Sequence, residues 1–248
     1  MKTKFLLAAA ALAAMASSQA ADHPAPHWDY RGKAGTSHWG DLEPDFATCK
    51  LGKAQSPVDL HAVKHGAAAP IDFHYAASHA EIVNNGHTVQ VNLPEGGTVH
   101  LPSGDYHVVQ FHFHTPSEET VNGKHYPLVA HLVHRNDAGE LAVVAVLFKQ
   151  GKENPALQPL FADLPPHAGD KHAVAGAFDL GALLPARHAY YAYMGSLTTP
   201  PCSEGVHWQI LQQPVEISKG QLAAFRKLYP MNARPVQPLN GRVVEITG

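Results

Sequence analysis

The chain has 248 residues, enough for one large domain with a substantial core, and no shift in composition along it marks a second domain. Lysine and arginine total 18 against 21 aspartates and glutamates, which gives a formal net charge of −3. Because the chain has no excess of basic residues, it lacks the positive charge that binds the phosphates of nucleic acid, so proteins that work mainly on nucleic acid are excluded.

The first twenty residues have the pattern of an export signal. Lys2 and Lys4 precede the apolar run FLLAAAALAAMA, and Ser18 and Ala20 supply small residues at the −3 and −1 positions of a cleavage site. The run is too short for a stop-transfer helix, and no later segment is long enough to span a bilayer. We expect residues 1–20 to be a signal peptide, cleaved near Ala20, and residues 21–248 to form a periplasmic or secreted domain.

The expected elements are mostly strands. In chain order, the expected helices are 43–51 and 219–228, with Ser218 capping the second. The expected strands, separated by turn signals such as NNG and PSGD, are 80–83, 88–93, 106–114, 128–134, 141–148, 189–193 and 206–211. The proline-rich stretch 155–166 predicts a surface loop. This pattern indicates a mainly β (α+β) domain with a mostly antiparallel sheet, short helices and long ordered loops.

Two histidines stand two positions apart in QFHFH, within the expected strand 106–114. Because the chain holds 19 histidines, roughly 1.4 such pairs arise from composition alone, so the bare pair is no evidence of a site. In a strand, however, His112 and His114 share a face, about 7 Å apart, while Phe111 and Phe113 point to the other. The phenylalanines can pack in a core while one ion sits between the imidazoles.

A third histidine, His131, follows the turn at Asn122 and Gly123 and can return opposite the first two in a hairpin. Three neutral imidazoles without cysteine and with little carboxylate suit Zn²⁺ with one coordination position left for water. Three core histidines with no metal are the alternative. His134 has the opposite strand parity and is given no ligand role, and His61 and His65 are expected to be exposed.

The chain carries only two cysteines, Cys49 and Cys202. In an exported chain such a pair is more often a structural disulfide than a metal or redox site, although both remain open at this point.

Eight sequence strings, all in the same order, resemble those of the α-class carbonic anhydrases, specifically their bacterial periplasmic branch. They are HWDY (27–30), AQSPVDL (54–60), NNGH (84–87), QFHFHTPSE (110–118), AHLVH (130–134), GELAVVAV (139–146), GSLTTPPCSE (195–204) and NARPVQPLNGR (232–242). The resemblance covers nearly the whole mature chain. It implies a single domain around a twisted, mostly antiparallel central sheet with short peripheral helices, and zinc at the base of a conical cleft.

The resemblance also implies an activity, the reversible hydration of carbon dioxide to bicarbonate and a proton. The zinc ligands matched are His112, His114 and His131, and the ion makes hydroxide available near neutral pH to attack the carbon of CO₂. Thr198 matches a hydroxyl that accepts the proton of this hydroxide and donates its own to Glu118. A homodimer is a further option that the resemblance leaves open.

Carbon dioxide carries no charge, so its site needs an apolar wall. The residues that match the family's substrate site are Val133, Val143, Leu197, Thr198, Thr199, Val206 and Trp208. His87 resembles the family's proton shuttle, because an imidazole can pass protons to buffer near neutral pH. Tyr30, Asn85 and Gln90 match residues that order water between the shuttle and the metal. From their local pattern alone, all of these would be ordinary core, loop or turn residues.

The resemblance supplies partners for the ligands as well. Gln110 matches the side chain that holds His112, and the backbone carbonyl of Asn232 matches the partner of His114. Cys49 and Cys202 match a disulfide of the bacterial branch, and the bond before Pro201 matches a cis peptide.

The sequence departs from the family at position 129, which usually holds a glutamate that accepts a hydrogen bond from the third zinc histidine. Val129 cannot accept one. We hypothesise that Glu119, at a position where relatives often carry histidine or asparagine, supplies this bond to His131. The alternative is a solvated Glu119, with water bound to His131. Asp29, where relatives usually have glycine, is expected to alter only the rim of the cleft.

Two other functions compete with hydration. A zinc-binding or ligand-binding protein on the same scaffold gains weight from Val129, but it has no need of Thr198, Glu118 and His87 together. A cupin-like oxygenase would need iron and a carboxylate ligand.

Overall fold

The computed structural model describes residues 27–61, 64–66 and 69–247. The expected signal peptide lies outside these residues. Within them, no helix is long and apolar enough to cross a membrane.

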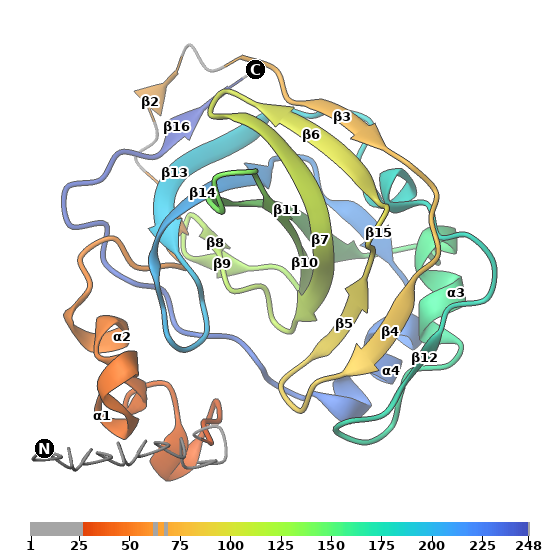
Figure 1. Cartoon of the computed structure of the whole chain (residues 1–248), viewed down its shortest axis with the longest axis horizontal. Coiled ribbons are helices and arrows are strands. Elements are labelled where there is room, and N and C mark those ends of the chain that lie inside the picture. The colour runs from red at the N-terminus through yellow and green to blue at the C-terminus, as the bar shows by residue number, and fades with distance from the viewer. Residues whose placement is uncertain (1–26, 62–63, 67–68, 248) are drawn as a thin grey trace, which may run out of the picture.

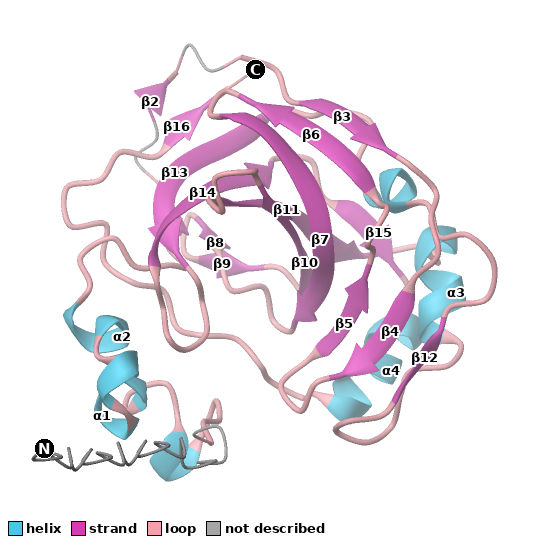
Figure 2. Ribbon diagram, in the orientation of Figure 1, coloured by secondary structure: helices cyan, strands magenta, loops and turns pink. Residues whose placement is uncertain are grey.

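A large, strongly twisted sheet dominates the molecule, and the helices lie at its periphery (Figures 1 and 2). The strands of this sheet are β2 (Lys64–His65), β3 (Asp72–Tyr75), β4 (Glu81–Asn84), β5 (Val89–Asn92), β6 (Gly97–Leu101), β7 (Gly104–His114), β10 (Leu128–Arg135), β11 (Leu141–Gln150), β12 (Lys171–Ala173), β13 (Tyr190–Ser196), β14 (Glu204–Leu211), β15 (Val215–Ile217) and β16 (Glu245–Ile246). Their main order is β12-β4-β5-β7-β10-β11-β14-β13-β16-β2. A separate small sheet contains β1 (Asp59–Leu60), β8 (Thr120–Val121) and β9 (Lys124–His125).

Most neighbouring strands are antiparallel, as expected from the sequence. The exceptions in the large sheet are β11 with β14, β11 with β15, and β16 with β2, which run parallel. All seven expected strands are present, with ends shifted by a few residues. The period-2 alternation of apolar residues therefore predicted the sheet correctly.

The main core lies on the face of the central strands that carries the phenylalanines. Phe111 and Phe113 of β7 are fully buried there. The ring of Phe113 contacts Phe161 of α3 (Gln158–Phe161) and Phe225 of α4 (Lys219–Leu228), at centroid distances of 5.4 and 5.8 Å. These two helices thus cover the face opposite to that of His112 and His114.

Helix α4 begins and ends where its sequence predicts. The side chain of Ser218 accepts from the backbone N–H of Gln221, and the Gln221 side chain accepts in return from the backbone N–H of Ser218, a complete capping box. Arg226 and Lys227 lie in the last turn, where positive charge is favoured.

Two expectations about helices and loops were wrong. The expected helix 43–51 is instead divided between a 3-10 turn at Pro44–Phe46 and α2 (Thr48–Leu51), because proline at position 44 starts a new turn; the short helix α1 (Trp39–Leu42) ends just before this stretch. The expected loop 155–166 contains a 3-10 turn at Pro155–Leu157 followed by α3. Its apolar side chains at 157, 160 and 161 are buried in the core, so this stretch is not a surface loop.

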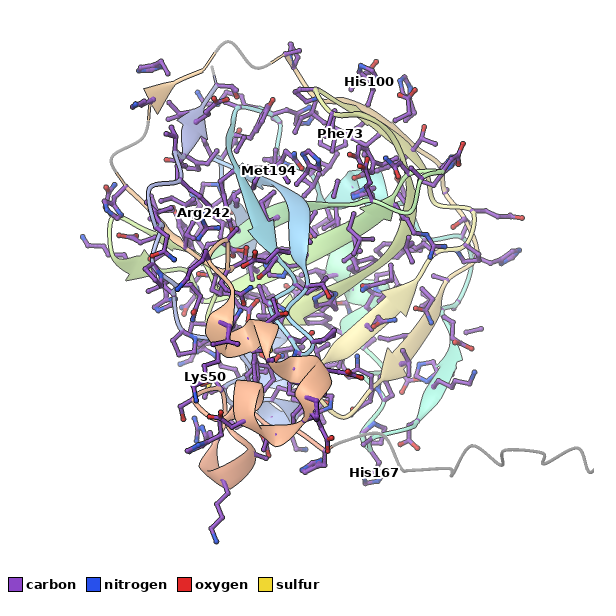
Figure 3. All side chains as sticks on the ribbon, turned by 60° about the vertical axis from the view of Figure 1, so that its left-hand side comes forward. Lys50, Phe73, His100, His167, Met194 and Arg242 are labelled. Atoms are coloured by element: carbon purple, nitrogen blue, oxygen red, sulfur yellow. A yellow bond between two sulfur atoms is a disulfide. The ribbon has the colours of Figure 1, made fainter. Side chains whose placement is uncertain are left out.

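The N-terminal and C-terminal segments are both fastened to the sheet. Cys49 and Cys202 form the expected disulfide, across a sequence separation of 153. Near the other end, Arg242 donates from its guanidinium to the carbonyl of Met194 at 2.9 Å, at the edge of β13, and both side chains lie on the same side of the molecule in Figure 3. Cis peptide bonds precede Pro57, Pro116 and Pro201, the last as expected.

Candidate metal centre and active site

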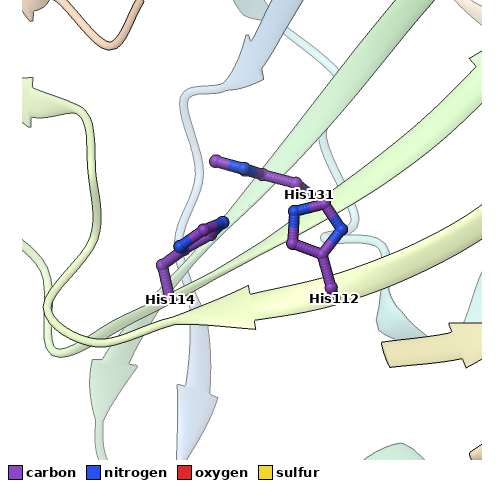
Figure 4. Close-up of side chains that lie close together, drawn as sticks. All are labelled: His112, His114 and His131. Atoms are coloured by element: carbon purple, nitrogen blue, oxygen red, sulfur yellow. The ribbon is translucent and has the colours of Figure 1, made fainter. Parts of the chain in front are cut away.

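Three imidazoles converge on one face of the central strands (Figure 4). His112 and His114 lie on β7, and the antiparallel register places His131 of β10 directly opposite His112. One nitrogen from each ring lies within 4.8 Å of the corresponding nitrogens of the other two. Among the residues that the structure describes, this is the one group of histidine, cysteine or acidic side chains arranged to hold a metal.

Each of the three rings also contacts an acceptor with its other nitrogen. Nδ1 of His112 lies 2.8 Å from Oε1 of Gln110. The corresponding contact of His114 is to the backbone oxygen of Asn232, at 2.7 Å. His131 uses its other nitrogen, Nε2, which lies 3.0 Å from Oε1 of Glu119. Since these oxygens accept and do not donate, each of these ring nitrogens carries the proton.

The remaining nitrogens suit a metal. Nε2 of His114 is buried and has no hydrogen-bond partner, an unusual state for a polar atom. Burial, and secondarily the neighbouring rings, lower the pKa of His112 to about 3 and that of His114 well below its ordinary value. Both rings are therefore neutral near pH 7, the form that binds metal. Three imidazoles, which bind metal in their neutral form, fit zinc with one position open, and they do not fit an iron site that needs a carboxylate ligand.

His131 differs from the other two in its charge environment. Burial lowers the pKa of its ring, but the carboxylate of Glu119, followed by that of Glu118, raises it by more. The net shift is upward.

A buried carboxyl group, Glu118, lies beside the cluster. Its Oε1 accepts from the backbone N–H of Arg234 at 2.8 Å and lies 3.5 Å from Nδ1 of His114. Burial is the largest cause that raises the pKa of Glu118 to about 7, while the charge of His131, the N–H of Arg234 and the side chain of Thr198 lower it. Thr198 is itself buried, in the loop after β13.

The apolar residues expected beside the metal also come together. Val143, Val206 and Trp208 are buried in a cluster separate from the main core, and Val133 and Leu197 pack against it. The register explains this arrangement, because Val133 lies opposite Val143 and Val143 lies opposite Trp208. The ring of Trp208 reaches His131, at a centroid distance of 4.9 Å.

His87 lies in the turn between β4 and β5 and is stacked on Trp28. The two rings are nearly parallel, at 7°, with centroids 3.6 Å apart. Partial burial is the largest cause lowering the pKa of His87, and the charge of Asp29 opposes it. The Asn232 side chain donates to the His87 carbonyl at 3.1 Å, while the Asn232 carbonyl contacts His114, so one residue joins this turn to the cluster.

The three residues expected to order water fall into two groups. Asn85 donates to Oε1 of Gln90 at 3.4 Å, so these two side chains are in contact. Tyr30 is buried against Trp28 and Trp39, and it borders the same surface pocket as His87. Asp29, expected to alter only the cleft rim, is exposed and borders that pocket too.

Sequence reasoning missed two residues near the site. Trp28 stacks on His87 although 59 residues separate them, and no local pattern predicts such a contact. Arg234 is buried, and its guanidinium donates to Gln55, to the Ser56 carbonyl and to the Cys49 carbonyl. Both residues lie inside sequence strings on which the family resemblance rests, HWDY and NARPVQPLNGR. Membership in these strings was the signal that could have identified them.

The histidines that were given no ligand role lie elsewhere. His134 points away from the cluster and bonds to the hydroxyl of Tyr75 at 2.8 Å. Burial lowers the pKa of its ring to about 4. His61 and His65 are exposed, as expected.

Comparisons with known proteins agree with this geometry. The family model described as eukaryotic-type carbonic anhydrase matches residues 34–248. A carbonic anhydrase of Pectobacterium atrosepticum is 42% identical over 245 residues, covering 98% of this chain and 99% of the relative. The solved structure of the α-carbonic anhydrase of Thermovibrio ammonificans with the inhibitor sulfanilamide is 47% identical, with a TM-score of 0.87, covering 89% of this chain and 99% of the other.

The same fold also occurs under another name. A structure of dioscorin complexed with ascorbate is 32% identical, with a TM-score of 0.84, covering 89% of this chain and 97% of that one. The extent of the family match, together with the identity to bacterial enzymes, shows that the chain belongs to the eukaryotic-type (α) carbonic anhydrase family of lyases.

Proposed function

We propose that this protein is an exported zinc enzyme that interconverts carbon dioxide with bicarbonate and a proton. The single observation that carries the proposal is the convergence of the three imidazoles. In each ring the outer nitrogen, the one that faces away from the cluster centre, contacts an acceptor, so that the lone pair of the other nitrogen is free to point toward one common position. His112 and His114 would hold zinc through Nε2, and His131 through Nδ1.

When bound, zinc supplies the positive charge that makes a nucleophile available from water near neutral pH, an effect for which carbonic anhydrase is itself the reference case. The protein then has to orient that nucleophile. Thr198 would do so by accepting a proton from it and donating its own hydroxyl to Glu118. The N–H of Arg234 on Oε1 of Glu118 supports this role, because it stabilises the carboxylate as an acceptor.

The apolar cluster beside the imidazoles would receive carbon dioxide. The surface is apolar and offers water few hydrogen bonds; it is formed by Val143, Val206 and Trp208, with Val133 and Leu197 at their edge. Thr199, the neighbour of Thr198, would complete the substrate site on the polar side. A neutral, linear substrate suits such a wall better than a charged one does.

Turnover also requires that a proton leave the site, and His87 would carry it to buffer. Its half-buried ring can be reached by solvent, and the turn that carries it is joined to His114 through Asn232. Tyr30, Asn85 and Gln90 would order the water between His87 and the metal. The stacking on Trp28 gives the ring a defined resting position.

A second candidate function is ligand binding on the same scaffold without catalysis. The observation in its favour is the structural similarity to dioscorin, whose structure was determined with ascorbate. Against it stands the set of Thr198, Glu118 and His87 around the imidazoles, which binding alone does not require.

Stopped-flow measurement of CO₂ hydration separates the two candidates. The protein spanning 21–248 is expected to accelerate hydration when zinc-loaded, to lose the acceleration after chelation and to regain it when zinc is restored. A zinc-containing sample that hydrates CO₂ no faster than buffer would favour binding.

We also propose that residues 1–20 direct export and are removed, which leaves one domain spanning 21–248. The disulfide between Cys49 and Cys202 supports an oxidising compartment. Mass determination of the protein secreted from its host is expected to give an N-terminus at Ala21.

A further inference from the structure

The three imidazoles of the cluster are held by acceptors of different kinds. His112 is held by an amide oxygen from its own strand, and His114 by a backbone carbonyl. His131 is held by the carboxylate of Glu119, which comes from the turn between β7 and β8. It is the one ring of the three whose outer nitrogen has a carboxylate as its hydrogen-bond partner; the outer nitrogen of His114 lies 3.5 Å from Glu118 but bonds to the carbonyl of Asn232.

The Glu119 side chain is fully buried, and a buried carboxylate is costly unless it is paired. Its Oε1 has the contact with His131, at 3.0 Å, while its Oε2 has no hydrogen-bond partner. The turn that carries it is fixed, because the Ser117 hydroxyl donates to the backbone carbonyl of Glu119 at 2.6 Å. The carboxylate is therefore held in place facing the ring.

The β-strand that carries His131 offers no substitute. Val129 lies on the same face of β10 as His131, two residues earlier. It is fully buried and packs in the apolar cluster with Leu147, which lies opposite it on β11. Among the residues described, Glu119 is the one that places a side-chain acceptor at Nε2 of His131.

We propose that Glu119 is the positioning residue of His131: it holds the proton on Nε2 and so presents Nδ1 to the metal, a task that Val129, two residues before His131 on the same strand, cannot perform. This inference rests on the proposed zinc site. A carboxylate partner also makes the imidazole a stronger donor to the metal, and the loss of such a partner typically weakens metal binding about 10- to 100-fold.

Zinc retention tests the proposal without reference to activity. The zinc-loaded protein is mixed with excess chelator, and zinc affinity is measured for the wild type, for Glu119→Ala and for Glu216→Ala, which removes a partly exposed carboxylate on β15, far along the chain. We expect Glu119→Ala to bind zinc about 10- to 100-fold more weakly and Glu216→Ala to match the wild type. Equal retention in all three would overturn the proposal.

A double variant distinguishes positioning from a merely structural role. Glu119→Ala/Val129→Glu returns a carboxylate to the face of β10 that carries His131, two residues earlier on the strand. We expect it to bind zinc more tightly than Glu119→Ala alone. A folded double variant that binds no better than the single one would count against positioning.

The wild type provides a test that does not depend on any variant being folded. Nitrogen NMR of isotope-labelled histidines in the zinc-loaded protein reports which ring nitrogen carries the proton. We expect Nε2 of His131 to be protonated, and Nδ1 of His112 and of His114. Coordination of zinc by Nε2 of His131 would refute the inference, whereas a correct pattern in a protein that fails to hydrate CO₂ would refute only the proposed function.

Discussion

The chemistry proposed for this protein depends on single hydroxyl and imidazole groups placed around the three ligands. Thr198 is a buried threonine, and the neighbouring carboxyl group of Glu118 accepts from the backbone N–H of Arg234. A hydroxyl in this position can pass on the direction of a hydrogen bond, because it accepts from one group while it donates to another.

Replacement of Thr198 by alanine removes this orientation without removing a ligand. We expect Thr198→Ala to lower kcat/KM for CO₂ hydration about 100-fold, the usual effect of a misplaced reacting group. The zinc content should stay that of the wild type. Stopped-flow rates and metal analysis on the same sample check both statements, and an unchanged kcat/KM would show that Thr198 has no part in catalysis.

His87 acts in a different step, so its loss should appear in a different constant. We expect His87→Ala to lower kcat about 10- to 100-fold at low buffer concentration and to leave kcat/KM nearly unchanged. Imidazole added as buffer should restore much of the rate, since it can carry the proton itself. A kcat that does not depend on residue 87 would assign proton transfer to another group.

At this scale the sequence predicted the convergence of the three imidazoles well and their surroundings less well. Strand parity was enough to place His112 and His114 on one face and Phe111 and Phe113 on the other, because the two-residue period is a property of the backbone. The stacking of Trp28 on His87 depends on how remote segments meet, which no local pattern encodes.

At the scale of elements, the two faces of the central strands differ: one carries the three imidazoles and the other packs in the main core. The strand β10 carries a histidine on each face: His131 faces the cluster of imidazoles, and His134 lies among buried side chains on the other face. Burial holds the pKa of His134 at about 4, so it stays neutral in the folded protein over most of the acidic range.

This shift makes stability depend on pH, with a definite sign. Because the folded pKa lies below the ordinary value of 6.5, the unfolded chain takes up the proton first as the pH falls. Stability contributed by the neutral ring is therefore complete above pH 6.5 and is lost down to about pH 4. A shift of this size corresponds to about 3 kcal/mol.

The variant His134→Gln removes this titration while it keeps a polar partner for Tyr75. Urea unfolding of the metal-free protein, measured from pH 7 to pH 4, is expected to show a flatter stability profile for this variant than for the wild type. The exposed His65→Gln serves as the control and should follow the wild type. Parallel profiles for all three proteins would place the acid sensitivity elsewhere.

Elements with a clear repeat were the predictable ones. All the expected strands and the helix at 219–228 are present, because alternation and a capping box are local signals. The stretch 155–166 was expected to be a loop because of its prolines. It packs Leu160 and Phe161 into the core, and such tertiary burial overrides a local preference.

At the scale of the whole molecule, contacts far apart in sequence hold the site together. The disulfide joins the N-terminal segment to the loop after Thr198, and Arg234 ties the C-terminal segment to Gln55 and to the carbonyl of Cys49. The loop that carries Thr198 and Cys202 is thus held by the disulfide and by the Gln55 amide, which donates to the Cys202 carbonyl at 3.0 Å.

Removal of the disulfide should destabilise the fold without removing the metal site. The link closes a loop of about 150 residues, so we expect Cys49→Ser/Cys202→Ser to lose about 2–5 kcal/mol of unfolding free energy. Chemical unfolding of the wild type under reducing and non-reducing conditions gives the comparison. Equal stability in the two conditions would mean that hydrogen bonds such as those of Arg234 hold the segment without it.

The central claim is that three neutral imidazoles hold one zinc ion and leave a single position open. A crystal structure of the zinc-loaded protein tests it most directly. We expect one ion about 2.0–2.1 Å from Nε2 of His112, Nε2 of His114 and Nδ1 of His131, with one non-protein ligand completing a tetrahedron. An ion that is bound elsewhere, or that has a carboxylate or a fourth protein side chain among its ligands, would contradict it.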